Sequence, residues 1–200
     1  MSCNQTLSNI IKPCGNGKGG IKTKIYVSLR KDVDFDGITF VEETAPYNTI
    51  NNLESSNWYT FEFGKNASSF ESVAQYDGTT GEFSFFKNNL TLSFRKMEAN
   101  LRLSIMALLQ SECVVIFEDA NGVRYFLGYN EPVSSESATH ATGTNSTDSN
   151  VVTVVLTDNS DELPYHVSDS VMNEILTAIG ENTNTPSTGG NNNNGDDLVG

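Results

Sequence analysis

Four acidic residues and a glycine near the start of the chain have the types and the spacing of a calcium-binding loop. Asp32, Asp34 and Asp36 stand at alternate positions, Gly37 follows, and Glu43 comes six residues after the glycine. Alternate carboxylates can converge on a hard cation, the glycine permits a sharp bend, and the last glutamate can bind through both oxygens. Calcium is therefore a candidate ligand of these four acids.

The surroundings of this pattern argue against calcium. The flanking residues predict a strand and a loop, whereas calcium loops of this type lie between two helices. Thr39 also stands where a larger apolar residue usually packs. We therefore favour an acidic turn with no metal and no cofactor, and we keep calcium bound by Asp32, Asp34, Asp36 and Glu43 as the alternative hypothesis.

Patterns for nucleotide binding or catalysis are weaker. Gly15, Gly17 and Gly20 fit G-x-G-x-x-G, but a nucleotide site needs a strand before the glycines and a helix after them. Here a predicted strand follows, so the glycines are expected to form a flexible arm. The two histidines, His140 and His166, lie in no recognisable nucleophile motif. We expect no catalytic residues and no enzymatic activity.

The cysteines and the N-terminal residues bear on where the protein folds. Cys3, Cys14 and Cys113 are odd in number and widely spaced, which fits neither a disulfide framework nor a metal knuckle. Cys113 lies in an apolar run and is expected to be buried. Residues 1–18 hold no apolar signal segment, and no window approaches the ~18 apolar residues of a membrane span. The sequence predicts folding in a reducing cytosol, with neither secretion nor membrane insertion.

Charge is distributed unevenly along the chain. The 12 basic and 25 acidic residues give a formal net charge of −13. All 12 bases lie at or before Arg124, where 14 acids leave a net of −2, and the last 76 residues hold 11 acids and no base. Such a surface repels nucleic acid. A basic DNA-binding groove is thereby excluded, whereas a surface that DNA passes without sticking is not.

Strands dominate the predicted secondary structure. Apolar and polar residues alternate over 21–29, which predicts a half-buried strand. Asn121-Gly122 supplies the turn of a hairpin. The β-branched run Val151–Thr157 is expected to be buried on both faces or to lie in an interface. The other predicted strands cover residues 38–41, 58–63, 70–76, 83–94, 113–117 and 123–129.

The hydrophobic period changes to that of a helix over residues 97–109. Apolar residues recur there at spacings of three and four, and neither Gly nor Pro intervenes. This predicts one amphipathic helix of about four turns. Leu101, Ile105 and Leu108 are expected to face the core, with Arg102 on the opposite side.

The rest of the chain completes the predicted architecture. Ser168 or Asp169 is suited to cap a short helix that ends at Gly180, and a last strand is the alternative. Residues 130–150 are polar and predict a long exposed loop. The expected fold is mainly β: a β-barrel or sandwich with one flanking α-helix, long loops and a polar C-terminal tail. Residues 1–20 form an N-terminal arm, 21–180 the β domain and 181–200 the polar flexible tail.

The order of these features is similar to that of a known protein family. A Gly-Gly pair precedes IKTKIYV (21–27), and an aromatic strand (58–63) and a long strand leading into a helix (83–109) follow. Then come the hairpin VVIFEDANGVRYFLG (114–128) and Thr142-Gly143, with Asp148 and Asn150 before VVTVVL (151–156). In order and spacing, roughly residues 14–180 resemble the tail tube proteins (major tail proteins) of tailed bacteriophages, particularly those with Bacteroidetes hosts.

The resemblance implies a structural virion protein made in the bacterial host cytoplasm. Such a subunit is expected to assemble into stacked, hexameric rings around a channel for DNA. Its partners would be copies of itself, other tail proteins of the virion and DNA in passage, with no membrane. The family supplies no catalytic residues. Alternatives are a calcium-dependent adhesion module displayed on a virion or surface, and a decoration or head–tail completion protein.

The acidic C-terminal part of the chain suits such a channel. Acids after Arg124 are expected to face the DNA, because like charge prevents the DNA from binding to the wall. The alternative is that these acids only keep polar loops in solution. The candidate residues are Glu131, Asp148, Asp158, Asp161 and Glu162.

Overall fold

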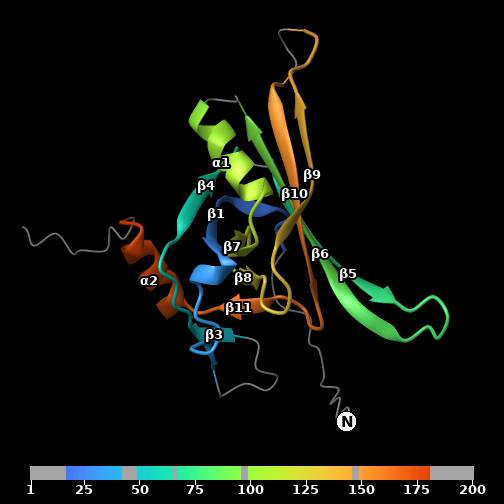
Figure 1. Cartoon of the computed structure of the whole chain (residues 1–200), viewed down its shortest axis with the longest axis vertical. Helices are drawn as coiled ribbons and strands as arrows, with labels where there is room; N and C mark the ends of the chain where they lie inside the picture. The colour runs from blue at the N-terminus through green and yellow to red at the C-terminus, as the bar shows by residue number, and fades with distance from the viewer. Residues whose placement is uncertain (1–16, 42–48, 65–66, 96–98, 146–148, 181–200) are drawn as a thin grey trace, which may run out of the picture.

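The computed structural model describes residues 17–41, 49–64, 67–95, 99–145 and 149–180 (Figure 1). Within them, eleven strands form two sheets, accompanied by two α-helices and one short 3-10 helix. The mainly β, sandwich-like fold expected from the sequence is confirmed. Residues 1–16 of the expected arm and all of the expected tail lie outside the described residues.

The larger sheet has seven strands in the order β2-β3-β11-β8-β7-β1-β4. Its strands pair antiparallel except β11 and β3, which are parallel. The predicted 21–29 strand and the hairpin are confirmed, and they form the centre of this sheet. The bounds are β1 (Ile21–Leu29), β2 (Thr39–Phe40), β3 (Thr49–Asn52), β4 (Tyr59–Glu62), β7 (Cys113–Asp119), β8 (Arg124–Leu127) and β11 (Tyr165–Val167).

The smaller sheet has four strands in the order β5-β6-β10-β9, all antiparallel. Two of them are long, with 13 residues in β6 and 10 in β10. Its two ends therefore reach past the body of the molecule, one as the β9–β10 pair and the other as the β5–β6 ribbon (Figure 1). The bounds are β5 (Ser69–Tyr76), β6 (Phe83–Arg95), β9 (Ser134–Ala141) and β10 (Val151–Ser160).

The main hydrophobic core lies between the two sheets. Successive side chains of a strand point to opposite faces, so Leu90, Leu92 and Phe94 of β6 share one face. They stand opposite Leu156, Val154 and Val152 of β10, and all six are buried. Helix α1 (Ala99–Leu109) adds Ile105 and Leu108 to this core, with Leu101 packed against it and Arg102 exposed. The predicted face of this helix is confirmed.

A second core covers the other face of the seven-stranded sheet. Helix α2 (Asp169–Ala178) packs Val171, Met172 and Ile175 into it. The Ser168 hydroxyl accepts a hydrogen bond from the Val171 N–H at 3.3 Å and so caps the helix, and Gly180 follows with φ +75°. The capped helix is confirmed and the alternative of a last strand is wrong. The fold therefore has two α-helices where one was expected.

Four other expectations need correction. The sheets do not close into a barrel, because both have edge strands in the described part of the chain. The exposed loop predicted for 130–150 contains strand β9, which pairs with β10 along its length. The burial of β10 alternates strictly from residue to residue, so burial on both faces is wrong, and a place in an interface stays a prediction. Between residues 30 and 57 the sequence predicts one strand, 38–41, whereas the structure also has the 3-10 helix η1 (Arg30–Asp32) and strand β3 there.

The error at β9 has a physical cause. Strand β9 reads Ser-Ser-Glu-Ser-Ala-Thr-His-Ala and has no buried residue, so its sequence carries no hydrophobic alternation. Its hydrogen bonds to β10, the next strand of the chain, keep it extended. No helix among the described residues is long and apolar enough to cross a membrane.

Candidate functional site

The acidic pattern at 32–37 forms a turn held by backbone hydrogen bonds. Asp32 ends the short 3-10 helix η1, and its carbonyl accepts from the Ser56 N–H at 3.1 Å. The Asp34 carboxylate accepts from the Gly37 N–H at 3.2 Å, which closes the turn locally. One carboxylate is thus committed to the loop's own backbone.

The acids of this turn do not gather into a metal centre in the described structure. Nowhere in the described part of the chain do three or more His, Cys, Asp or Glu side chains form a group that could hold a metal ion. Glu43, the fourth acid of the calcium hypothesis, lies outside the described residues. The hypothesis therefore has no support from the placement of Asp32, Asp34 and Asp36.

The histidines and the buried cysteine lie apart. His140, on exposed β9, has a ring nitrogen 3.1 Å from the Asn150 side-chain oxygen. His166, on β11, packs edge-on against Tyr125 at 5.3 Å between ring centres. Cys113 is 2% exposed, as expected, and burial raises the pKa of its thiol to about 11. At neutral pH this thiol stays protonated and is a poor nucleophile.

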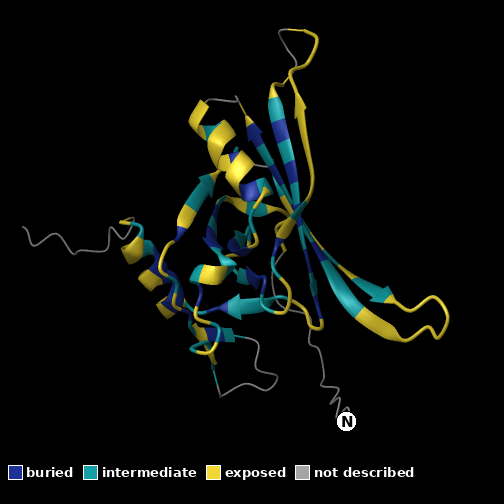
Figure 2. Ribbon diagram, in the orientation of Figure 1, coloured by how far each residue is buried: buried dark blue, intermediate teal, exposed yellow. Residues whose placement is uncertain are grey.

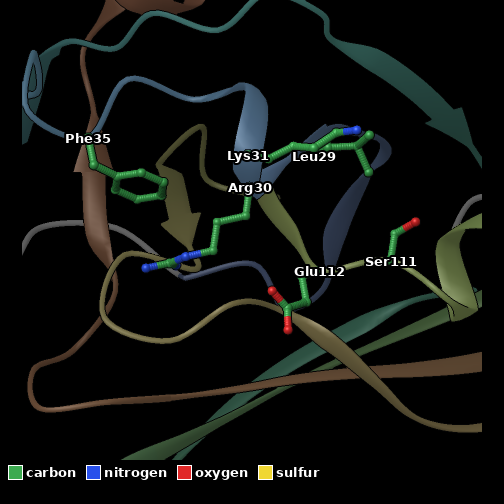
Figure 3. Close-up of a pocket in the computed structure, with 6 residues that line it drawn as sticks. All are labelled: Leu29, Arg30, Lys31, Phe35, Ser111 and Glu112. Carbon is green, nitrogen blue, oxygen red and sulfur yellow. The ribbon is translucent and has the colours of Figure 1, made fainter.

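Arg30 stabilises the crossing of the chain from one sheet to the other. Its guanidinium donates to the carbonyls of Gly128, Tyr129 and Asn130 and lies 4.4 Å from the centre of the Phe35 ring (Figure 3). The adjoining depression of about 560 Å³ is lined by this arginine (Figure 3). Because the guanidinium is occupied by three carbonyls, Arg30 has a structural role and does not make the depression an anion site.

Asp158 was expected to face a channel, and this is wrong. It is 4% exposed and lies on the inner face of β10, where its Oδ2 accepts from the Gly128 N–H at 3.1 Å. Burial raises the pKa of its carboxyl to about 6, partly offset by that hydrogen bond. Asn88, directly opposite on β6, lies close enough to favour the charged form, although its amide makes no hydrogen bond of normal geometry.

The remaining candidate acids gather at one end of the four-stranded sheet. Glu131, Asp161 and Glu162 are exposed and lie in the segments that enter β9 and leave β10. Asn159 donates to Glu131 at 3.0 Å, and Tyr165 donates to Glu162 at 3.2 Å. Asp148 lies outside the described residues. Three of the five predicted acids are thus brought together at the surface.

The outer face of the four-stranded sheet is covered by no other element in the described part of the chain. Its residues stand between the core residues of β6 and β10, as Ser93 and Thr153 do, with their hydroxyls 3.4 Å apart. None of its side chains belongs to either hydrophobic cluster. Lys87 pairs with Glu136 at 2.7 Å near one side. The face combines hydroxyl groups with the apolar Val151 and Val155, and Glu71 and Arg95 also stand on it.

The edges of this sheet are also open. Strands β5 and β9 each pair on one side only within the described residues. An unpaired edge presents a row of N–H and C=O groups that can pair with another chain. Because the sequence predicts a loop at β9, sequence reasoning misses this edge. Val152, Val154 and Leu156 are buried at every second position of β10. The same alternation in the sequence could have predicted that Asp158 is buried.

Comparison with known proteins leaves the function to be argued from this geometry. No family model matches the chain, and the searches of curated proteins and of solved structures found no match either.

Proposed function

We propose that this protein is a tail tube subunit of a tailed bacteriophage. Copies assemble into stacked rings, hexameric as the resemblance implies, around a channel through which DNA passes. The observation that carries the proposal is the four-stranded antiparallel sheet with two open edges and an uncovered polar face. The protein has a structural role in the virion tail and works with copies of itself and with other tail proteins.

Strand direction in this sheet suits ring formation. The four strands alternate in direction from β5 to β9, so β5 and β9 run antiparallel to each other. When β9 of one copy pairs with β5 of the next, the alternation continues without interruption. A head-to-tail contact of this kind closes into a ring if the rotation between copies permits it. Ring closure would pair every edge of this sheet.

The uncovered face suits a channel wall. Hydroxyl side chains such as Thr91, Ser93 and Thr153 remain in contact with water, and Lys87 is neutralised by Glu136. Arg95, at the end of β6 on the same face, is the one further cation of the four strands there, so the wall offers few contacts to the phosphates of passing DNA. The acid cluster of Glu131, Asp161 and Glu162 then lies at the rim of each ring.

The alternatives have less to support them. A calcium-dependent adhesion module needs a metal loop, and the described acids of that loop do not converge. A decoration or head–tail completion protein has the same β character, but neither role calls for two open edges and an uncovered polar face on one sheet.

Negative-stain microscopy of the purified protein tests the proposal. Wild-type protein should form rings or tubes with a central channel. Thr139→Lys on β9 and Val73→Lys on β5 should prevent this, because a charge on an edge strand opposes pairing with another edge. Asn173→Lys, the same charge added on the exposed side of α2, is the matched control and should assemble normally. Wild-type protein that stays monomeric at every concentration and salt would overturn the proposal.

A further inference from the structure

A pocket opens where the two sheets part beside strand β5. It has a volume of about 500 Å³, within the range of ligand sites in proteins. Three aromatic rings from three strands line it, those of Phe70, Phe117 and Tyr125. The ring of Phe117 lies 4.7 Å from that of Phe70 and 5.3 Å from that of Tyr125. All three rings belong to or pack against the main core, so the core reaches the surface here.

The lining of this pocket is only partly covered by the described residues. Strand β5 has half-buried and exposed residues but no buried one (Figure 2). Leu163, which also lines the pocket, is 59% exposed. The hydroxyl of Ser72, another lining residue, is buried without a hydrogen-bond partner in the part of the chain that the structure describes. Open apolar surface marks an interaction site, and a buried hydroxyl needs a partner.

The described chain begins beside this pocket. Lys18 and Gly20 are among the residues that line it, and the turn between β7 and β8 holds both of them. The Lys18 N–H donates to the Asn121 side chain at 2.8 Å, and the Asn121 amide donates back to the Lys18 carbonyl at 3.0 Å. The Ala120 N–H donates to the Gly20 carbonyl at 3.0 Å. Residues 1–16 therefore join the fold at a fixed point next to the pocket.

The sequence before this point suits the pocket. Residues 7–11, Leu-Ser-Asn-Ile-Ile, carry three large aliphatic side chains and end six residues before Gly17. Pro13, Gly15 and the pair Asn16-Gly17 follow, and these residue types favour turns. A loop of so few residues closes at a low cost in entropy. Attachment to Lys18 also keeps the aliphatic segment at a high effective concentration near the pocket.

Charge favours a contact between this segment and its own chain. Residues 1–16 hold one base, Lys12, and no acid, so their formal net charge is +1. The rest of the chain holds 11 bases and 25 acids, which leaves −14. The segment is therefore attracted to the body of the protein, and Asp119 is one of the residues that line the pocket.

We propose that residues 7–11 of the N-terminal arm dock in this pocket of their own chain. Their aliphatic side chains pack on Phe70, Tyr125 and Leu163, and a backbone group of the arm bonds to the Ser72 hydroxyl. Phe70 and Ser72 point to the inner face of the sheet, as Leu90 opposite Phe70 does, so the arm leaves the open edge of β5 to other copies. The contact lies within one copy and holds whether or not copies assemble into a tube.

Hydrogen–deuterium exchange of the full chain, followed by mass spectrometry, tests this contact. In wild-type protein the amides of residues 7–11 should exchange about tenfold more slowly, or slower still, than in a synthetic peptide of residues 1–16, which has no pocket to enter. Ile10→Ser with Ile11→Ser should remove this protection. The control, Asn4→Ser with Gln5→Ser, changes two polar residues of the same arm and should keep it.

A variant of the pocket tests the other side of the contact. Leu163→Ser removes an exposed side chain that lines the pocket, and it should release residues 7–11 as the arm variant does. Leu103→Ser is the matched control, because it removes a 64% exposed leucine of α1 outside the pocket. This control should leave the protection of residues 7–11 unchanged.

Protection that is independent of protein concentration and is lost in both variants supports the contact. Wild-type residues 7–11 that exchange as fast as the free peptide overturn it, and so does protection that Leu163→Ser leaves intact. Protection that grows with protein concentration would show that another copy supplies the arm, and it would overturn docking within one copy. Tubes are detected separately by microscopy, so failure of this contact leaves the tube proposal standing.

Discussion

Asp158 is a buried carboxyl in a row of polar side chains across the inner face of the four-stranded sheet. Ser72, Asn88 and Asp158 stand opposite one another on β5, β6 and β10. Several of their polar atoms are buried without a partner, among them Oδ1 of Asp158. Burying an unpaired polar group costs free energy. The row lies at the border of the core, next to Gly128, where the chain crosses between the sheets. Asp158 links the two sheets through its hydrogen bond to the Gly128 N–H, and its buried, unpaired oxygen lowers the stability of the fold.

Asp158→Asn should remove a pH-dependent loss of stability. The carboxyl's pKa is raised from 3.8 to about 6 in the folded protein, so the unfolded chain loses its proton first as pH rises. The contribution of Asp158 to stability therefore falls between about pH 4 and 6 and stays low at pH 7. Asparagine keeps an acceptor for the Gly128 N–H, so the variant should be as stable as wild type at pH 7, or up to about 2–3 kcal/mol more stable.

Urea unfolding at pH 4.5 and pH 7 measures this difference. Wild type should lose stability relative to the variant between these two pH values, and the exposed control Asp161→Asn should follow wild type. A variant less stable than wild type at pH 7 would contradict the prediction, because the ionised carboxylate would then be a net stabiliser.

Among the elements, helix α1 is attached to the fold by one face, which packs Ile105 and Leu108 into the main core. Ile105 is 3% exposed in the main core, so Ile105→Asp loses its packing and buries an unpaired charge. The expected cost is about 3 kcal/mol or more. Arg102, on the exposed side, should tolerate Ala within about 0.5 kcal/mol. Thermal unfolding of the two variants checks the prediction, and equal melting temperatures would show that the helix packs by another face.

Elements with their own hydrophobic signal could be predicted from the sequence. Alternation located β1, and a period near 3.6 located α1 and its buried face. Strands β3 and β9 could not be predicted in this way, because they contain almost no buried residue. Their extended form depends on the strands with which they pair, β10 for β9 and β2 and β11 for β3, and short polar windows carry no trace of such pairing.

The candidate site, too, could be predicted only where its strands have a hydrophobic pattern. Its central strands, β6 and β10, are strongly patterned and were predicted. Its edge at β9 was predicted as a loop, so the open sheet could not be recognised from sequence. The acidic turn at 32–37 matched a metal pattern in spacing, but spacing alone does not bring carboxylates together.

For the whole molecule, strand order is the information that the sequence lacked. The chain enters the four-stranded sheet at β5–β6, returns to the seven-stranded sheet at β7–β8, and goes back for β9 and β10. The crossing from β8 to β9 begins at Gly128. Its carbonyl accepts a hydrogen bond from Arg30, and its N–H donates one to Asp158. Interleaving of this kind packs both sheets around the main core.

The net charge of the whole molecule leads to a prediction about assembly. A net charge of −13 makes subunits repel one another, and the repulsion is screened beyond about 8–10 Å at physiological salt. Assembly should therefore increase as salt rises from very low values. If Glu131, Asp161 and Glu162 lie at the channel rim, changing all three to Lys should give tubes that retain DNA inside, because duplex DNA carries one charge per ~1.7 Å and contacts add up from ring to ring.

Nuclease protection distinguishes the channel from the outside of the tube. The matched control changes three exposed acids elsewhere, Asp36, Glu54 and Glu174, to Lys, and so adds the same charge. DNA bound by the rim variant should survive nuclease treatment of the assembled tubes, whereas DNA bound by the control should be digested. If both variants bind only nuclease-sensitive DNA, the three acids face the exterior and serve to keep the protein in solution.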